Sequence, residues 1–275
     1  MANVLQELIQ QLSLERMDEN QFRGQSQDLG WGQVYGGQVL GQSLSAAYQT
    51  VPSDRLAHSM HAYFLRLGDV SMPVTYEVDR IRDGRSFTTR RVVAMQKGRP
   101  IFNMSASFQV LEEGFEHQDV MPVVPGPEGL APEMLAQPLS ARPIELYSID
   151  PVDLFAPESK FQSHAVWMRA TDRLDDAPGL HHALLAYASD FSFMPTALRP
   201  HGVGLASRKV KVASIDHVMW FHRPFRMDEW LLHVIHSPSA SGARGMVRGS
   251  IFTRDGRLIA STAQEGLMRR RSPTV

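Results

Sequence analysis

The strongest constraint on the fold is an internal repeat, in which one pattern of antiparallel strands occurs twice along the chain. Residues 74–110 alternate β-rich runs with turn signals at Asp83-Gly84 and Lys97-Gly98, and this pattern predicts an antiparallel meander. Residues 230–268 repeat it, with turn signals at Ser241-Gly242 and Asp255-Gly256. An offset of 158 aligns five identical pairs: Gly84 with Gly242, Arg90 with Arg248, Gly98 with Gly256, Arg99 with Arg257, and Ile101 with Ile259. Chance resemblance between hairpins is the alternative, but the agreement of glycines, turns and element order favours a duplication.

The segments that precede each meander also correspond. Residues 63–66 (YFLR) align with residues 220–223 (WFHR) at an offset of 157, one residue less than the offset of the meanders. A helix is expected before each meander, over Gly36–Tyr48 in the first half and over Leu180–Met194 in the second, where Pro195 should end it. The order of helix and then long strands therefore occurs twice.

A segment of different composition separates the halves. Eight of the 17 prolines fall between Pro122 and Pro157, which indicates an extended connector. New strands are expected near Ile144 and from Ser163 onward. We expect an N-terminal repeat over residues 1–118, a connector over 119–143, and a C-terminal repeat over 144–275 that carries the catalytic acid.

A long antiparallel sheet with one apolar helix against its face is an α+β arrangement, in which the sheet wraps around the helix. Two such sheets can pair edge to edge, and pairing would remove exposed edges that invite aggregation. It would also bring the two helices together and create a cleft between the repeats, where ligands usually bind.

Five stretches resemble one known family: GQVYGGQVLGQSL, SDFSFMPTALRPHG, SIDHVMWFHRPF, SASGARGMVRG and STAQEGLMR. They sample both halves of the chain and resemble the acyl-CoA thioesterase II group of double-hotdog enzymes. The resemblance implies a double hotdog fold, catalytic residues Asp190, Ser214 and Gln264, and hydrolysis of medium to long-chain fatty acyl-CoA without a cofactor. It also suggests a homo-oligomer, a tetramer of double-hotdog chains. Ser214 departs from the threonine that the family often has, although both residues carry a hydroxyl.

The residues of the two predicted helices indicate one composite site. In single-repeat hotdog thioesterases, a His-Gly-Gly pattern opens the helix and an acid follows seven residues after the second glycine. The first repeat keeps the glycines, Gly36 and Gly37, but has Leu44 at the acid position. The second repeat has lost the glycines and keeps the acid, Asp190. We therefore expect one site per chain, where amides near Gly36 and Gly37 polarise the thioester carbonyl.

The residue types suit attack by water. Asp190 lies among apolar residues, so desolvation should raise its pKa and make it a better base. The amide of Gln264 and the hydroxyl of Ser214 can each donate one hydrogen bond and accept another, and so fix a water beside Asp190. A serine nucleophile is the competing mechanism, but the chain has no Gly-x-Ser-x-Gly elbow.

Other functions and sites remain as alternatives. An enoyl-CoA hydratase usually pairs an acid with a histidine, which the expected set lacks; a non-catalytic acyl-CoA-binding module is the third possibility. The pairs His58/His61 and His217/His222 lack a carboxylate at zincin spacing, so no metal site is expected. The segment Arg269–Arg271 is either a contact for coenzyme phosphates or a solvated basic tail.

Composition narrows the partners and the compartment. The net charge of −1 argues against a nucleic-acid partner. The absence of cysteine excludes disulfides and a thiol nucleophile, and it suits a reducing compartment. The N-terminal segment has neither a long apolar run nor a basic leader, so no secretion signal or membrane span is expected. The C-terminal sequence lacks the peroxisomal tripeptide. We expect a cytoplasmic protein.

Overall fold

A computed structural model describes residues 3–132, 142–151, 163–207 and 209–271. The N-terminal half contains α1 (Val4–Leu12), β1 (Glu15–Asp18), β2 (Gln21–Gly24), α2 (Gly36–Tyr48), β3 (Arg55–Phe64), β4 (Val74–Asp83), β5 (Phe87–Gln96) and β6 (Arg99–Val110). The C-terminal half contains β7 (Ile144–Ser148), β8 (Ser163–Ala170), α3 (Pro178–Ser189), α4 (Phe193–Leu198), a 3₁₀ turn (Arg199–His201), β9 (Val210–Ser214), β10 (Asp216–Phe221), β11 (Leu231–Ser241), β12 (Arg244–Thr253) and β13 (Leu258–Arg270). No helix in these described ranges is long and apolar enough to cross a membrane.

Both predicted meanders are present. Strands β4, β5 and β6 pair in sequence, and so do β11, β12 and β13, all antiparallel. Two of the hairpins turn through left-handed residues, at Lys97 and Gly98 (φ of 50° and 68°) and at Gly242 and Ala243 (φ of 57° and 59°). Positive φ at both central residues is the geometry of a two-residue type I′ hairpin, whose twist matches that of the strands.

The structure corrects part of the sequence alignment. Strands β5 and β12 share their pattern of buried and exposed residues at nine of ten positions when the offset is 157. Arg90 is therefore not the counterpart of Arg248: Arg90 is buried, whereas Arg248 is exposed like Arg91. A slip of one residue exchanges the two faces of a strand. The offset becomes 158 only in β6 and β13, because the turn before β13 has one extra residue.

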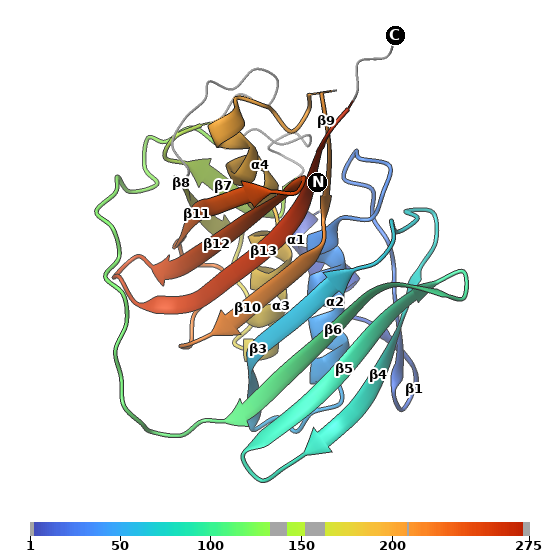
Figure 1. Ribbon diagram of the computed structural model, residues 1–275. Helices are drawn as coiled ribbons and strands as arrows, with labels where there is room; N and C mark the ends of the chain where they lie inside the picture. The colour runs from blue at the N-terminus through green and yellow to red at the C-terminus, as the bar shows by residue number, and fades with distance from the viewer. Residues whose placement is uncertain (1–2, 133–141, 152–162, 208, 272–275) are drawn as a thin grey trace.

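One continuous sheet joins the halves, as Figure 1 shows, with β3 of the first half beside β10 of the second. The pairing is symmetric. His61 pairs with Val218, the residue that corresponds to it at the offset of 157. The same offset converts the pair Tyr63/Asp216 into the pair Trp220/Ser59. A local pseudo-twofold axis therefore passes between His61 and Val218. The expected double hotdog fold, with the sheets paired edge to edge, is confirmed.

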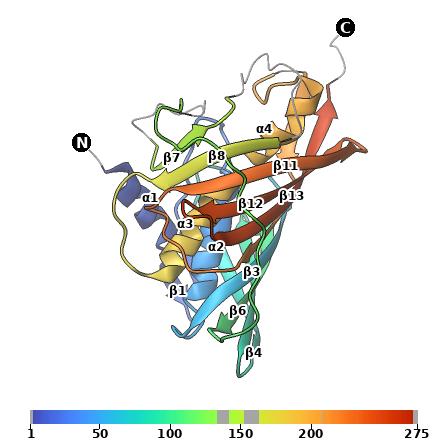
Figure 2. The ribbon, with the colours of Figure 1, turned by 90° about the vertical axis from the view of Figure 1, so that its left-hand side faces the viewer.

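The sheet curves around α2 and α3, which lie side by side against its inner face (Figure 2). The two helices are antiparallel, since Gly37 lies against Tyr187 and Gly41 against Ala183. A Cβ added to Gly37 would lie 2.2 Å from the Tyr187 carbonyl oxygen, and one added to Gly41 would lie 2.9 Å from the Ala183 carbonyl oxygen. Glycines four residues apart share one helix face, so they let the two backbones approach closely.

The helix expected over Gly36–Tyr48 is confirmed, but the one expected over Leu180–Met194 is divided in two. Helix α3 begins earlier, at Pro178, where proline is favoured because its missing N–H would be unpaired anyway. It ends at Ser189, with Asp190 as its C-cap, and α4 begins at Phe193. Pro195 does not end a helix. It lies in the first turn of α4, where its missing N–H breaks no intrahelical bond.

The connector after β6 runs along the C-terminal half (Figure 2). The Gln118 side chain donates to the Gly256 carbonyl and accepts from the Leu258 N–H, and the Trp167 indole donates to the Pro125 carbonyl. Strand β7 begins at Ile144 and β8 at Ser163, as expected. Residues 133–141 of the expected connector lie outside the described residues, and the boundaries 1–118, 119–143 and 144–275 stay a prediction.

Candidate active site

The two halves meet where α2 begins and α3 ends, and the predicted residues Gly36 and Asp190 lie there in contact. A Cβ added to Gly36 would lie 2.6 Å from Oδ2 of Asp190 and 3.0 Å from the Phe64 ring. Asp190 is half-buried as a residue, but its Oδ1 atom is buried and has no hydrogen-bond partner among the described residues. The composite arrangement expected from the sequence, with glycines from one repeat and the acid from the other, is the arrangement observed.

Ser214 and Gln264 lie together beside Asp190. Gln264 Nε2 donates to Ser214 Oγ at 2.9 Å, which joins the end of β9 to the middle of β13. Both side chains also interact with the Asp190 carboxylate, as does the backbone N–H of Gly37. All five predicted site residues therefore belong to one cluster.

Burial sets the electrostatics of this cluster. It raises the pKa of Asp190 to about 7, against an ordinary value of 3.8, because a charged carboxylate loses solvation there. Contacts with Gln264, the Gly37 N–H and Ser214 oppose this rise, because each stabilises the charged form. A carboxylate with a pKa near 7 is well matched to take and return a proton at neutral pH.

The first turn of α2 supplies free donors next to the acid. The first N–H groups of a helix have no intrahelical partner, and Tyr35, the N-cap of α2, gives no side-chain cap. The positive end of the helix dipole is at the same place. Since the Gly37 N–H interacts with Asp190, the Gly36 N–H is the one available to an incoming oxygen atom.

Sequence reasoning missed the residue that orients Gln264. His217 Nδ1 lies 2.6 Å from Gln264 Oε1, and His217 Nε2 lies 3.0 Å from Ser189 Oγ. Burial lowers the pKa of His217 to about 4, so the ring is neutral and donates from Nδ1 to the amide oxygen. This contact turns the NH₂ group of Gln264 toward Ser214. The sequence carries no local signal for this role, because it depends on β10 pairing with β13.

Basic residues gather at the far end of β9 and β13 from this cluster. A cavity of about 620 Å³ lies there, and it is lined in part by Lys209, Arg244, Arg270 and Arg271. The Arg271 N–H donates to the Lys209 carbonyl and holds the two chain segments together. Arg270 and Arg271 line this cavity, and all three residues of the segment Arg269–Arg271 are exposed. A contact for coenzyme phosphates and a solvated basic segment therefore both stay predictions.

Comparison with known proteins decides the family. The family described as "Acyl-CoA thioesterase N-terminal domain" matches residues 26–109, and "Acyl-CoA thioesterase" matches residues 152–267. Acyl-CoA thioesterase 2 of Haemophilus influenzae is 44% identical, over 98% of this chain and 99% of the relative. The chain belongs to the acyl-CoA thioesterase II family. Human acyl-coenzyme A thioesterase 8 is 39% identical, over 94% of this chain and 87% of the relative.

Solved structures agree with this thioesterase assignment. The crystal structure of an acyl-CoA thioesterase II, TesB2, from Mycobacterium marinum superposes with a TM-score of 0.82 at 42% identity, and the match covers 97% of this chain and 99% of that one. The protein is a thioester hydrolase that acts on acyl-CoA. The roles of individual side chains follow from the geometry and are proposed below.

Proposed function

We propose that the thioesterase hydrolyses medium to long-chain fatty acyl-CoA by direct attack of a water that Asp190 activates. The observation that carries the mechanism is the buried, unpartnered Oδ1 of Asp190, on a carboxyl whose pKa is about 7, beside the hydroxyl and amide of Ser214 and Gln264. Such a carboxylate has a free lone pair for one hydrogen bond from water.

Hydrolysis takes place in two stages, addition of water and loss of coenzyme A. Asp190 takes a proton from the water while the water oxygen bonds to the thioester carbon. The carbonyl oxygen becomes an oxyanion, which the Gly36 N–H and the α2 dipole stabilise. The intermediate then collapses, the carbon–sulfur bond breaks, and Asp190 returns the proton so that coenzyme A leaves as a thiol. The fatty acid is the second product.

The alternative function, hydration of an enoyl thioester, is disfavoured. Hydration of an enoyl thioester usually needs a histidine beside the acid, but both ring nitrogens of His217 are occupied, by Gln264 and Ser189. The role of His217 in positioning Gln264 explains why it lies in the site, and that role needs no contact with substrate.

The basic cavity supports a place for the coenzyme. We propose that Lys209, Arg270 and Arg271 contact its phosphates, because clustered cations suit phosphate groups. Arg244 already pairs with Glu265 at 2.9 Å. Charge-reversal of Arg270 should raise KM for palmitoyl-CoA and leave kcat nearly unchanged. An unchanged KM would place the coenzyme elsewhere.

We also propose a homo-oligomer, with a tetramer as the expected state, in the cytoplasm. Large side chains are exposed on the outer face near the β3–β10 junction, where Tyr63 is 55% and Trp220 is 38% exposed, and such patches mark interfaces. Sedimentation velocity tests the assembly, since a monomer has a mass of 30.8 kDa. Cell fractionation tests the compartment, for which the absence of cysteine is the support.

A single-turnover experiment in ¹⁸O-water tests the mechanism. Direct attack places one solvent oxygen in the fatty acid during the first turnover. Covalent catalysis through the Asp190 carboxylate would instead permit a first-turnover product without ¹⁸O, with the label in the protein, and that result would overturn the proposal. Thiol release across acyl lengths, from acetyl-CoA to palmitoyl-CoA, tests the proposed chain-length preference.

A further inference from the structure

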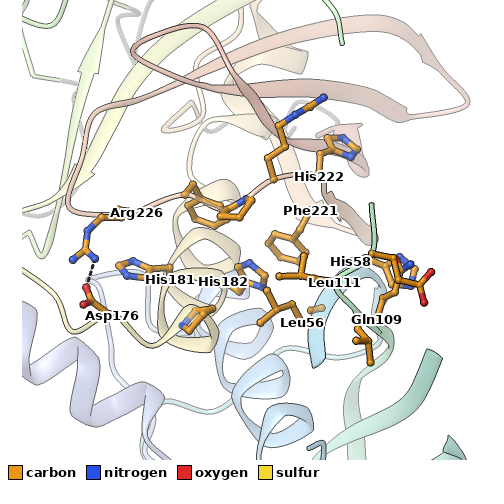
Figure 3. A pocket seen from close by; sticks show the side chains of 17 residues that line it. Leu56, His58, Gln109, Leu111, Asp176, His181, His182, Phe221, His222 and Arg226 are labelled. Carbon is orange, nitrogen blue, oxygen red and sulfur yellow. Dashed lines mark hydrogen bonds and ion pairs between the residues drawn. The ribbon is translucent and has the colours of Figure 1, made fainter. Parts of the chain in front are cut away.

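A second cavity, of about 480 Å³, lies at the opposite end of the helix pair from Asp190. Because α2 and α3 are antiparallel, the end of α2 meets the start of α3 there: Gly179 lies against the Tyr48 ring, and the Tyr48 hydroxyl lies 2.7 Å from His182 Nδ1. Figure 3 shows its walls, which come from both repeats. They include Leu56, Ala57, Val110, His181, Phe221 and Phe225.

This cavity is the pseudo-twofold counterpart of the active site. On the strands, the offset of 157 carries Ala57 onto Ser214, and the pair Ala57/Phe108 corresponds to the pair Ser214/Gly266. In both halves the strand pairing shifts register at this point, between Ala57 and Ser59 in one and between Ser214 and Asp216 in the other. The two ends of the molecule are therefore built on the same backbone.

The helices correspond at an offset of 146. Tyr48 packs on Phe108 with ring centroids 5.0 Å apart, and Met194 packs in the same way on Gly266, where an added Cβ would lie 2.1 Å from its sulfur. This offset carries Gly36 onto His182. As Gly36 lies against Phe64, so His182 stacks on Phe221, the counterpart of Phe64, with centroids 4.3 Å apart.

The catalytic groups are missing at this end. The counterparts of Asp190, Ser214 and Gln264 are Leu44, Ala57 and Ala106, all buried and apolar. No acid of the described residues stands in for Asp190 at this position, so this cavity cannot hydrolyse a thioester by the mechanism above. The cavity is nevertheless present, and the apolar part of its wall, which includes Leu56, Phe221 and Phe225, suits a hydrocarbon chain.

One polar group in the wall lacks a partner. His181 is 3% exposed, and its Nδ1 accepts from the Met227 N–H at 3.0 Å. Burial lowers the pKa of His181, so the ring is neutral and its proton lies on Nε2. That Nε2 atom is buried and makes no hydrogen bond of normal geometry among the described residues, although the Asp175 backbone also interacts with the ring. A buried donor without an acceptor is costly, and an oxygen of a bound ligand would satisfy it.

The charges at the mouth argue against the coenzyme as part of that ligand. Leu111 and Glu112 line this cavity, at the positions that correspond to Arg269 and Arg270 at the catalytic end. Arg226 is already paired with Asp228 at 2.9 Å, and it also pairs with Asp176. Phosphates, with several negative charges, would therefore meet Glu112, Asp176 and two arginines that already have partners, Arg223 and Arg226. A fatty acid carries at most one charge, and desolvation favours its protonated form, so its head meets a smaller obstacle.

We propose that this cavity is a second, non-hydrolytic site that binds a free fatty acid, the product of the family's reaction. A carboxyl oxygen accepts a hydrogen bond from His181 Nε2, and the chain lies along Leu56, Phe221 and Phe225. A fatty acyl thioester carries the same chain and a similar oxygen, so the test separates the acid from the coenzyme ester.

The test is equilibrium dialysis with laurate and, separately, with dodecyl-CoA thioether, which cannot be hydrolysed. The wild type should bind two laurates per chain, one at each end, but one thioether. His181→Asn keeps an acceptor for the Met227 N–H, but its shorter amide places no N–H at the position of Nε2, so it should weaken the second laurate site about tenfold or more. Leu56→Trp narrows the cavity from its partly exposed wall and should abolish that site.

The controls separate this proposal from the catalytic one. His117→Asn alters an exposed histidine on the connector and should leave both laurates bound. Thioether binding and kcat for lauroyl-CoA should stay unchanged in Leu56→Trp, because its side chain is at the far end of the helices from Asp190. A number of bound laurates per chain that Leu56→Trp leaves unchanged from the wild type would overturn the proposal. Two thioethers per chain would assign the cavity to the ester instead. None of these outcomes depends on the role of Asp190.

Discussion

Replacing Asp190 by asparagine should abolish most hydrolysis and yet stabilise the protein at alkaline pH. The pKa of this carboxyl is about 7 in the folded chain and 3.8 ordinarily. Between these two pH values the folded state retains a proton that the unfolded state has lost, so the stability of the wild type falls as pH rises. At about 1.4 kcal/mol per pH unit, the full difference is about 4 kcal/mol at pH 8. Asparagine cannot ionise and escapes this cost.

Urea unfolding at pH 5 and pH 8, at one protein concentration, measures the effect. The free energy of unfolding of Asp190→Asn should exceed that of the wild type by about 4 kcal/mol at pH 8 and by about 2 kcal/mol at pH 5. The gap should close near pH 4. Asp119→Asn, which removes an exposed carboxylate, should show no such gap. A difference that does not change with pH would show that Asp190 is not held in a desolvated site, and the account of its basicity would fail.

Three further outcomes follow from the same cluster. The wild-type kcat should rise with pH through about 7, as Asp190 loses its proton, and reach a plateau above that pH. Ser214→Ala should lower the plateau value of kcat about tenfold, and Ser214→Thr should keep it near that of the wild type. Stopped thiol-release assays from pH 5.5 to 9 measure both effects. His217→Leu should lower kcat less than Gln264→Ala does. The double variant should have the kcat of Gln264→Ala alone, because His217 acts through Gln264. A double variant that loses the sum of the two single effects would contradict this. Gly36→Ala should lower kcat about a hundredfold, because the added Cβ would lie 2.6 Å from the Asp190 carboxylate and displace it. Full activity would show that the close approach of Gly36 to Asp190 is not needed.

The architecture was predictable from the sequence because hairpin turns and strand alternation are local signals. The turn at Lys97-Gly98 and the helix Gly36–Tyr48 lie where those signals put them, whereas the turn expected at Ser241-Gly242 lies one residue later, at Gly242-Ala243. The one-residue difference between the two offsets was also visible in the sequence. Its location was not, because Arg90 and Arg248 look equivalent until the burial of each is known.

The cluster of the active site was predictable only in part. Asp190 and Gly36 followed from what each repeat keeps and lacks, whereas Ser214 and Gln264 came from family resemblance, since polar strand residues carry no local mark. His217 was missed because its role depends on which strand lies beside β10, a long-range fact. The end of α3 was misplaced because Asp190, Phe191 and Ser192 form a turn that apolar periodicity does not reveal.

The pairing of His61 with Val218, its counterpart in the other repeat, has an evolutionary consequence. Two identical hotdog chains that met across this axis would carry every substitution twice, so an acid gained or lost at one end would be gained or lost at the other. Joining the copies in one polypeptide removes that restriction, while the pairing of β3 with β10 preserves the geometry of both ends. Each end is then free to acquire its own chemistry.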